Sequence, residues 1–184
     1  MNIAHVVESL ALGGLERVVV SLARIQIGHG HRVLVVCLFE SGVLAAQVRA
    51  LGGEVVVCHK TSGFDLRALR LVRKAVQTFR ADVVHTHNAV AHYYAALATA
   101  GLRLQSLLNT RHGMGSFPFS WRRELLYRIA LARTDAAVSV CDAARKRFVS
   151  HRIMPAAKAL TVRNGTNVRA FNERRKPEFK KFAG

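Results

Sequence analysis

Polar side chains capable of chemistry end two apolar runs of the sequence. His85, His87 and Asn88 end the run ADVVHTHN, and Arg111 and His112 end the run LLNTRH. Such runs are typical of strands in a parallel sheet, and ligands of open α/β sheets bind at the carboxyl edge, where these side chains would gather. An imidazole there can orient a hydroxyl group or stabilise developing charge, so His87 and His112 are the candidates. For His85 we expect only a hydrogen-bonded position at the strand end.

A zinc ion is a second use for the histidines of this region. The available set is His85, His87, His92 and His112. It lacks an H-x-x-x-H pair on a helix and has no carboxylate beside it, two features that support zinc sites. We therefore predict no metal site and no metal cofactor.

Two glycines, Gly13 and Gly14, stand where the first apolar run passes into a helix that we expect to begin near Glu16. Glycine lets the main chain approach a ligand closely, and the free amides of a helix N-terminus attract anions, so the pair can hold a phosphate. The spacing is not G-x-G-x-x-G, which argues against a dinucleotide fingerprint. A tight strand-to-helix turn explains the same residues, and the sequence leaves both interpretations open.

A fold must position these residues, and the alternation of strand-like and helix-like segments along the sequence predicts which one. Short β-branched runs recur between segments of helical periodicity, and most runs are continuously apolar, as in strands covered on both faces. The pattern predicts an α/β fold with a doubly wound, mostly parallel, Rossmann-like sheet. Seven strands are expected, at Ile3–Val7, Val33–Phe39, Glu54–Cys58, Asp82–Thr86, Ser106–Thr110, Ala136–Val140 and Leu160–Arg163.

The composition fits one folded domain with a strong positive charge. The 184 residues are 51% hydrophobic, and 28 Lys and Arg against 11 Asp and Glu give a net charge of +17. This hydrophobic content excludes a disordered basic tail, and the charge favours nucleic acid, an acidic membrane or phosphorylated small molecules as partners. Cys37, Cys58 and Cys141 lie in apolar runs without CxxC spacing, which indicates buried thiols in a reducing compartment. Because the N-terminus has no signal-peptide pattern, we expect a cytoplasmic protein.

The chain divides into a domain and a short basic tail. Residues 1–171 carry the expected elements, whereas residues 172–184 lose aliphatic side chains, gain basic ones and include Pro177. This change is typical of a linker, and we expect it to lead to a further domain that these residues do not contain.

Five ordered segments together resemble the N-terminal domain of the family-4 retaining glycosyltransferases, which have the GT-B fold. They are ALGGLERVVVSLA, ADVVHTHN, LLNTRHGM, TDAAVSVCDAARKRF and VRNGTNVRAF. The resemblance implies one half of a GT-B architecture, the acceptor-side domain, with a donor domain to follow. It also implies transfer of a sugar from a nucleotide-sugar donor to a glycan or lipid-linked acceptor, in the synthesis of cell-envelope polysaccharide, lipopolysaccharide or glycolipid. Because one wall of a cleft cannot position both substrates, we expect the isolated chain to be inactive.

The resemblance also implies roles for single residues. His112 matches the histidine near the reacting sugar or the acceptor, and is the expected catalytic group. Gly13 and Gly14 match the loop that approaches the donor diphosphate. Further substrate contacts are implied for His87, Asn88, Arg111, Arg123 and Asn164. Of these, the arginines would contact a phosphate of the acceptor, and Asn164 opens the turn before the interdomain hinge; Asn167 stands where the family often has aspartate.

Aromatic and basic side chains lie together after His112, at Phe117, Phe119, Trp121 and Arg122. Aromatic rings suit the headgroup region and guanidinium groups bind lipid phosphate, so we predict an interface with an anionic membrane and a peripheral position at its inner face. A second basic segment, the helix after Asp65, is explained equally well by core packing with a solvated basic face.

Two other function classes stay open. A nucleic-acid-binding protein fits the charge, but the chain lacks an RNP-type strand and the spacing of a helix-turn-helix or zinc finger, so no specific nucleic acid is expected. A non-catalytic, Rossmann-like protein that binds a nucleotide or nucleic acid is the alternative if no further domain follows.

Overall fold

The computed structural model describes residues 1–114 and 120–165, and all seven predicted strands are present with ends within one or two residues of the expected positions. The strands are β1 (Asn2–Ser9), β2 (Arg32–Glu40), β3 (Glu54–Val57), β4 (Val83–His87), β5 (Ser106–Arg111), β6 (Ala136–Ser139) and β7 (Ala159–Thr161). The α-helices are α1 (Gly14–Gly28), α2 (Ala45–Ala50), α3 (Leu66–Phe79), α4 (Asn88–Ala98), α5 (Trp121–Leu131) and α6 (Asp142–Ser150), and a 3-10 turn, η1 (Ala156–Lys158), precedes β7.

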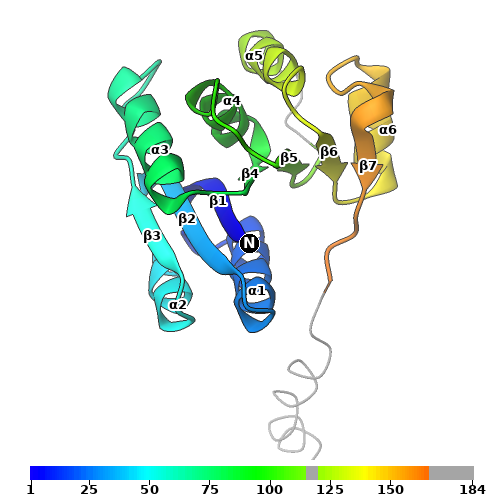
Figure 1. Cartoon of the computed structure of the whole chain (residues 1–184). Coiled ribbons are helices and arrows are strands. Elements are labelled where there is room, and N and C mark those ends of the chain that lie inside the picture. Colours follow the sequence, from blue (N-terminus) through cyan, green and yellow to red (C-terminus); the bar gives the residue numbers. More distant parts are fainter. Residues whose placement is uncertain (115–119, 166–184) are drawn as a thin grey trace, which may run out of the picture.

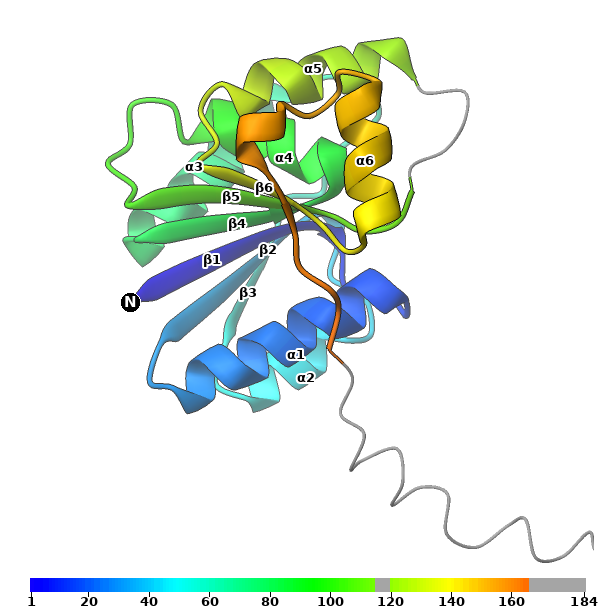
Figure 2. The ribbon, with the colours of Figure 1, turned by 90° about the vertical axis from the view of Figure 1, so that its right-hand side faces the viewer.

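The strands form one parallel sheet in the order β3-β2-β1-β4-β5-β6-β7. The order runs outward from β1 in both directions, so the right-handed crossovers place helices on both faces. Helices α1 and α2 lie on one face, and α3, α4, α5 and α6 lie on the other (Figures 1 and 2). The predicted doubly wound sheet is therefore confirmed. Its direction of winding reverses between β1 and β4, where such sheets bind ligands at the carboxyl edge.

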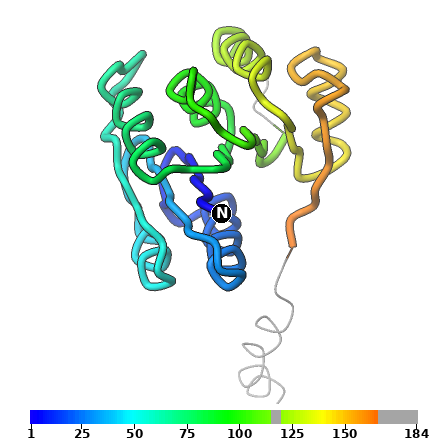
Figure 3. The backbone as a smooth tube through the Cα atoms, in the orientation of Figure 1, coloured from blue at the N-terminus to red at the C-terminus, as the bar shows by residue number. Residues whose placement is uncertain are grey.

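Alternating side chains of the strands enter two apolar layers. Val33, Val35 and Cys37 of β2 pack toward α1 and α2, whereas Leu34 and Val36 pack toward α3 and α4. Both faces of β2 are buried, which explains why its sequence is a continuous apolar run rather than an alternating one. Figure 3 follows the chain from the N-terminus, at the start of β1, an inner strand of the sheet.

The basic helix α3 is a core helix. Its buried stripe consists of Ala68, Val72, Val76 and Phe79. Asp65 caps the helix by accepting a hydrogen bond from the Ala68 N–H at 2.9 Å, and hydrogen bonds from the Thr61 and Ala68 amides lower the pKa of its carboxyl to about 2. The arrangement supports the core-packing interpretation of this segment.

The cysteines have no disulfide partner. Cys37 and Cys58 are buried, and burial raises the pKa of their thiols to about 12 and about 11. Cys141 is only half-buried, and its Sγ accepts from the Ala144 N–H at the start of α6. Across residues 1–114 and 120–165, no helix is long and apolar enough to cross a membrane.

Candidate functional site

The predicted polar residues meet at the carboxyl edge of the three central strands. His87 ends β4, His112 follows β5, and Gly13 precedes α1 after the end of β1. Because β1, β4 and β5 are adjacent and parallel, these ends lie on the same edge, where the winding of the sheet reverses. The structure therefore brings together two of the predicted histidines and places the glycine loop on their edge of the sheet.

A row of hydrogen-bonded histidines runs along the face of the sheet that α1 covers, and reaches this edge. His5 Nδ1 lies 3.0 Å from His87 Nε2, and His87 Nδ1 lies 3.0 Å from His112 Nε2. At the other end of the row, His5 Nε2 lies 2.8 Å from Oε1 of Gln26 in α1. We call Gln26, His5, His87 and His112 the histidine row.

Burial keeps the rings of the row neutral. Desolvation lowers the pKa of His5, and lowers that of His87 well below its ordinary value, with electrostatic effects of His85, His5 and His112 adding to the lowering at His87. Burial also lowers the pKa of His112 to about 4. At neutral pH each ring therefore has one N–H donor and one lone-pair acceptor.

His85 lies beside the row but outside it. Its Nε2 lies 2.8 Å from Oγ1 of Thr110, and burial lowers its pKa to about 3. This is the hydrogen-bonded position that the sequence predicts for His85.

His5 and Gln26 are the members of the site that sequence reasoning missed. His5 lies inside the first apolar run, and Gln26 lies near the far end of the next helix. Only the pairing of β1 with β4 identifies His5, because it sets His5 opposite His85 and on the same face as His87. That pairing follows from the strand order and could not be read from local sequence.

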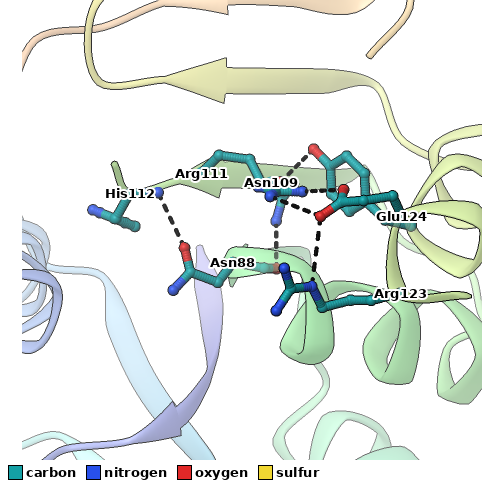
Figure 4. A network of polar contacts seen from close by, with 7 residues as sticks. Asn88, Asn109, Arg111, His112, Arg123 and Glu124 are labelled. Atoms are coloured by element: carbon teal, nitrogen blue, oxygen red, sulfur yellow. Dashed lines mark hydrogen bonds and ion pairs between the residues drawn. The ribbon is translucent and has the colours of Figure 1, made fainter. Parts of the chain in front are cut away.

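Two asparagines support the main chain on the His112 side of the site (Figure 4). Oδ1 of Asn88 accepts from the His112 N–H at 3.1 Å, and Asn88 has a left-handed φ of 65°. Nδ2 of Asn109 donates to the Asn88 carbonyl at 3.1 Å, and its Oδ1 accepts from the Tyr127 hydroxyl at 2.8 Å. Asn88 therefore positions His112, and the substrate contact expected of Asn88 stays a prediction.

Arg111 is committed to a buried ion pair. Its guanidinium binds both carboxylate oxygens of Glu124, at 2.8 and 3.2 Å, and lies over the rings of Tyr127 and Phe148. Only 5% of each charged residue is exposed. The geometry favours a role in fixing α5 to β5 over the phosphate contact that we expect of Arg111.

Arg123 is better placed for an anion than Arg111. It is half-buried, and its Nε lies 3.5 Å from Oε1 of Glu124. The same arginine acts electrostatically on Glu8 at the end of β1: burial raises the pKa of Glu8, and Arg123 opposes that rise. Glu8 and Arg123 thus add a carboxyl and a guanidinium to the edge that carries His112, and Glu8 was not among the predicted residues.

The glycine loop offers main chain rather than side chain. Gly13 is the N-cap of α1 in an extended conformation and provides no capping side chain. A Cβ on Gly14 would meet no atom within 4 Å, whereas a Cβ on Gly13 would overlap the carboxylate of Glu16 in the first turn of α1. Gly42 packs directly against the main chain of Leu10 before this loop: its φ is 66°, and a Cβ added there would overlap the Leu10 main chain. The loop is therefore open at Gly14, and an anion bound by main-chain amides there, as in the phosphate interpretation, would share the positive end of α1 with the Glu16 carboxylate.

Helix α5 presents an apolar and basic outer face, which we call the α5 face. Trp121 is 68% exposed and Ile129 is 62% exposed, and the guanidinium of Arg122 lies 5.2 Å from the centre of the Trp121 ring. Leu125 and Leu126 are also exposed on this helix. Phe117 and Phe119, which we predict to share the membrane interface, lie outside the described residues.

The four-histidine zinc set does not assemble. His92 points into the opposite layer, where its two ring nitrogens lie 2.8 Å from Oγ1 of Thr86 and 2.9 Å from Oγ1 of Thr134. Among the described residues, the group with ligand atoms close enough for a metal ion is His5, His85 and His87, within 4.8 Å of one another. The His5 and His87 nitrogens are only 3.0 Å apart, a hydrogen-bond distance, whereas two ligands of a tetrahedral zinc ion with bonds of about 2.1 Å lie about 3.4 Å apart.

Two further features lie apart from the histidine row. Asn164 is exposed and follows β7, so it leaves the sheet at the carboxyl edge, and its expected hinge role stays a prediction. A pocket of about 490 Å³ lies between α5 and the segment after α6, lined in part by Arg128, Ile153 and Met154. The pocket is on the side of the sheet where the strands begin and the helices end, opposite the carboxyl edge, and none of the predicted site residues lines it.

Comparison with known proteins gives a family and a fold. The model of the family described as Glycosyltransferase Family 4 matches residues 12–170. No curated protein sequence matches the chain.

Solved structures with similar folds belong to larger proteins. Anabaena HepE, solved in complex with UDP, has a TM-score of 0.77 and 22% identity over 93% of this chain and 46% of its own. A glycosyltransferase from Rickettsia africae has a TM-score of 0.77 and 16% identity over 97% of this chain and 47% of its own. Acinetobacter baumannii MurG has a TM-score of 0.61 and 10% identity over 90% and 45%. The chain thus spans about half the length of these structures, and at such identities the likeness shows the fold.

Proposed function

The chain belongs to glycosyltransferase family 4, and on that premise we propose that it is the acceptor-side half of an enzyme that transfers a sugar from a nucleotide-sugar donor. The acceptor would be a glycan or a lipid-linked glycan of the cell envelope. One observation carries the proposal: a half-buried, neutral histidine, His112, shares the carboxyl edge of the central strands with a glycine loop that is open at Gly14. The complex of the similar HepE structure with UDP supports a nucleotide as the ligand class.

The chemistry assigned to these groups is binding and orientation. The Gly13–Gly14 main chain would approach the donor diphosphate, and the neutral His112 would hydrogen-bond a sugar hydroxyl at the reacting centre. Arg123 would contact an anionic group of the acceptor. We propose no metal cofactor, because main-chain amides of the loop can bind the diphosphate.

A domain that forms only one wall of a cleft can bind a substrate but cannot catalyse sugar transfer by itself. The purified chain should bind a nucleotide sugar weakly and transfer no sugar, because the opposing donor-side wall that excludes water and fixes the donor is absent from these residues. The measurement is calorimetry and a transfer assay with a panel of UDP-, GDP- and ADP-sugars. His112→Ala should weaken the binding at least about 10-fold, a loss of roughly 1.4 kcal/mol. His29→Ala, at an exposed histidine of the α1 end, is the matched control and should bind as the wild type does. Efficient transfer by the chain alone would contradict the proposal.

A binding protein for nucleic acid is the competing function, supported by the net charge of +17. Nonspecific binding through phosphates falls steeply with salt, whereas a nucleotide sugar held at a defined edge should bind with a shallower salt dependence. Binding of a short DNA duplex that persists above 0.2 M salt and is not displaced by any nucleotide sugar would favour the competitor.

The α5 face supports a peripheral position on an anionic membrane, on the cytoplasmic side that we propose for the chain. Its exposed tryptophan and isoleucine can enter the headgroup region while Arg122 meets lipid phosphate. Trp121→Ala combined with Arg122→Ala should abolish cosedimentation with vesicles of anionic lipid. The matched control is Ile25→Ala with Arg24→Ala, which removes an exposed apolar and basic pair from α1. Equal loss of binding in both double variants would show that overall charge, not the α5 face, attracts the membrane.

A further inference from the structure

The histidine row has a direction. The Oε1 atom of Gln26 can only accept a hydrogen bond, so the His5 Nε2 that lies 2.8 Å from it carries the proton. A neutral His5 then has a lone pair on Nδ1, which must accept from His87 Nε2 at 3.0 Å. By the same step, the lone pair on His87 Nδ1 must accept from His112 Nε2 at 3.0 Å.

The direction ends at an unpaired atom. With its proton on Nε2, the His112 ring has a lone pair on Nδ1, and this nitrogen has no hydrogen-bond partner among the described residues. An unpaired polar atom that is covered from solvent costs free energy, which a ligand donor would recover. His112 as a whole residue is half-buried, and it lies at the carboxyl edge of the sheet, outside the core.

We propose that Gln26 and His5 are positioning residues that act through His87 to hold His112 as the Nε2–H tautomer, so that Nδ1 accepts a hydrogen bond from a substrate hydroxyl. The proposal rests on the function proposed above, since it names the donor and acceptor roles at that site. A single tautomer of His112 selects among ligands. Its Nδ1 accepts a hydrogen bond from a hydroxyl or an N–H group, and it disfavours a carbonyl or phosphate oxygen, which can only accept, at the same place.

Several features of the surroundings favour one fixed tautomer. Burial disfavours a second proton on any ring of the row, so no imidazolium is present to reverse the order at neutral pH. His85 lies with its ring centre 4.4 Å from that of His87, but its Nε2 is occupied by Thr110. The His112 main chain is also fixed, by Oδ1 of Asn88.

The test is the protonation pattern of the histidines in this chain, read by long-range ¹H–¹⁵N correlation at pH 7 without any ligand. The expected result is a proton on Nε2 of His5, His87 and His112. Gln26→Leu removes the acceptor and should convert His112 from a single tautomer to a mixture. Gln26→Glu keeps an acceptor oxygen and should retain the single form, while Gln47→Leu, the same change on α2, should have no effect. The amide spectrum of each variant reports folding.

Three outcomes would overturn the proposal. A proton on Nδ1 of His112 in the wild type would reverse the direction of the row. An unchanged His112 tautomer in a folded Gln26→Leu variant would remove the role of Gln26. Stoichiometric binding of Zn²⁺ with coordination by ring nitrogens of His5 and His87, seen as a change in their ¹⁵N shifts, would replace the row with a metal site. The protonation pattern is measured without substrate. Failure to bind nucleotide sugars would therefore overturn the proposed function without changing the measured tautomer of His112, so the two failures can be told apart.

Discussion

At the scale of single residues, the site depends on neutral histidines inside a strongly basic protein. Five of them, His5, His85, His87, His92 and His112, have a pKa lowered chiefly by burial. Folding thus selects the uncharged imidazole at each position. An uncharged imidazole can accept a hydrogen bond from a sugar hydroxyl, which a protonated one cannot.

The lowered pKa values predict a loss of stability in acid. As pH falls below the ordinary histidine pKa of 6.5, the unfolded chain takes up protons that the folded chain refuses until about pH 4 at His112 and about pH 3 at His92. Stability is therefore full above pH 6.5 and decreases between pH 6.5 and about 3, with each such histidine contributing up to about 1.4 kcal/mol per pH unit. Urea denaturation at pH 7 and pH 4.5 measures the effect.

His92→Gln isolates one contribution, because His92 is outside the histidine row. This variant should be less stable than the wild type at pH 7 but should lose less stability on acidification. Equal losses in the two proteins would contradict the assignment of a neutral, buried His92.

At the scale of elements, the positions of the strands could be predicted from the sequence, but the side-chain contacts between neighbouring elements could be predicted only in part. The valine-rich run of β2 identified a strand because both of its faces are buried, and a local pattern suffices for that. The carboxyl-edge position of His87 and His112 followed from the parallel arrangement. The contact of His5 with His87 depends on the register of β1 against β4, and the commitment of Arg111 to Glu124 depends on where α5 packs. Neither of these is encoded in a short stretch of sequence.

Helix α5 is fixed to the sheet by the Arg111–Glu124 pair, and this gives a prediction of stability. Glu124→Gln leaves the guanidinium charge buried without its counter-charge, and should lower the free energy of unfolding by about 3 kcal/mol. The matched control is Glu54→Gln in the exposed Arg32–Glu54 pair, which should cost less than about 1 kcal/mol. Similar costs for both variants, measured by urea denaturation, would show that the buried pair does not anchor α5.

At the scale of the whole molecule, the chain has the dimensions and fold of one half of the larger structures that it resembles. Its helices cover the sheet on both faces, and the polar residues collect at one edge instead of in an enclosed pocket. An edge of this kind can form one wall of a cleft. The net charge of +17 suits anionic ligands of several classes, so charge alone does not identify the ligand.

The central claim is that the carboxyl edge of β1, β4 and β5 binds a nucleotide sugar. The most direct measurement is an NMR titration of the ¹⁵N-labelled chain with the panel of nucleotide sugars, against inorganic pyrophosphate as the anion control. The account predicts that at least one nucleotide sugar gives saturable shifts concentrated at Gly13, Gly14, His87 and His112, and that pyrophosphate does not reproduce the His112 shift. Saturable shifts centred elsewhere, or no saturable shift with any member of the panel, would contradict it.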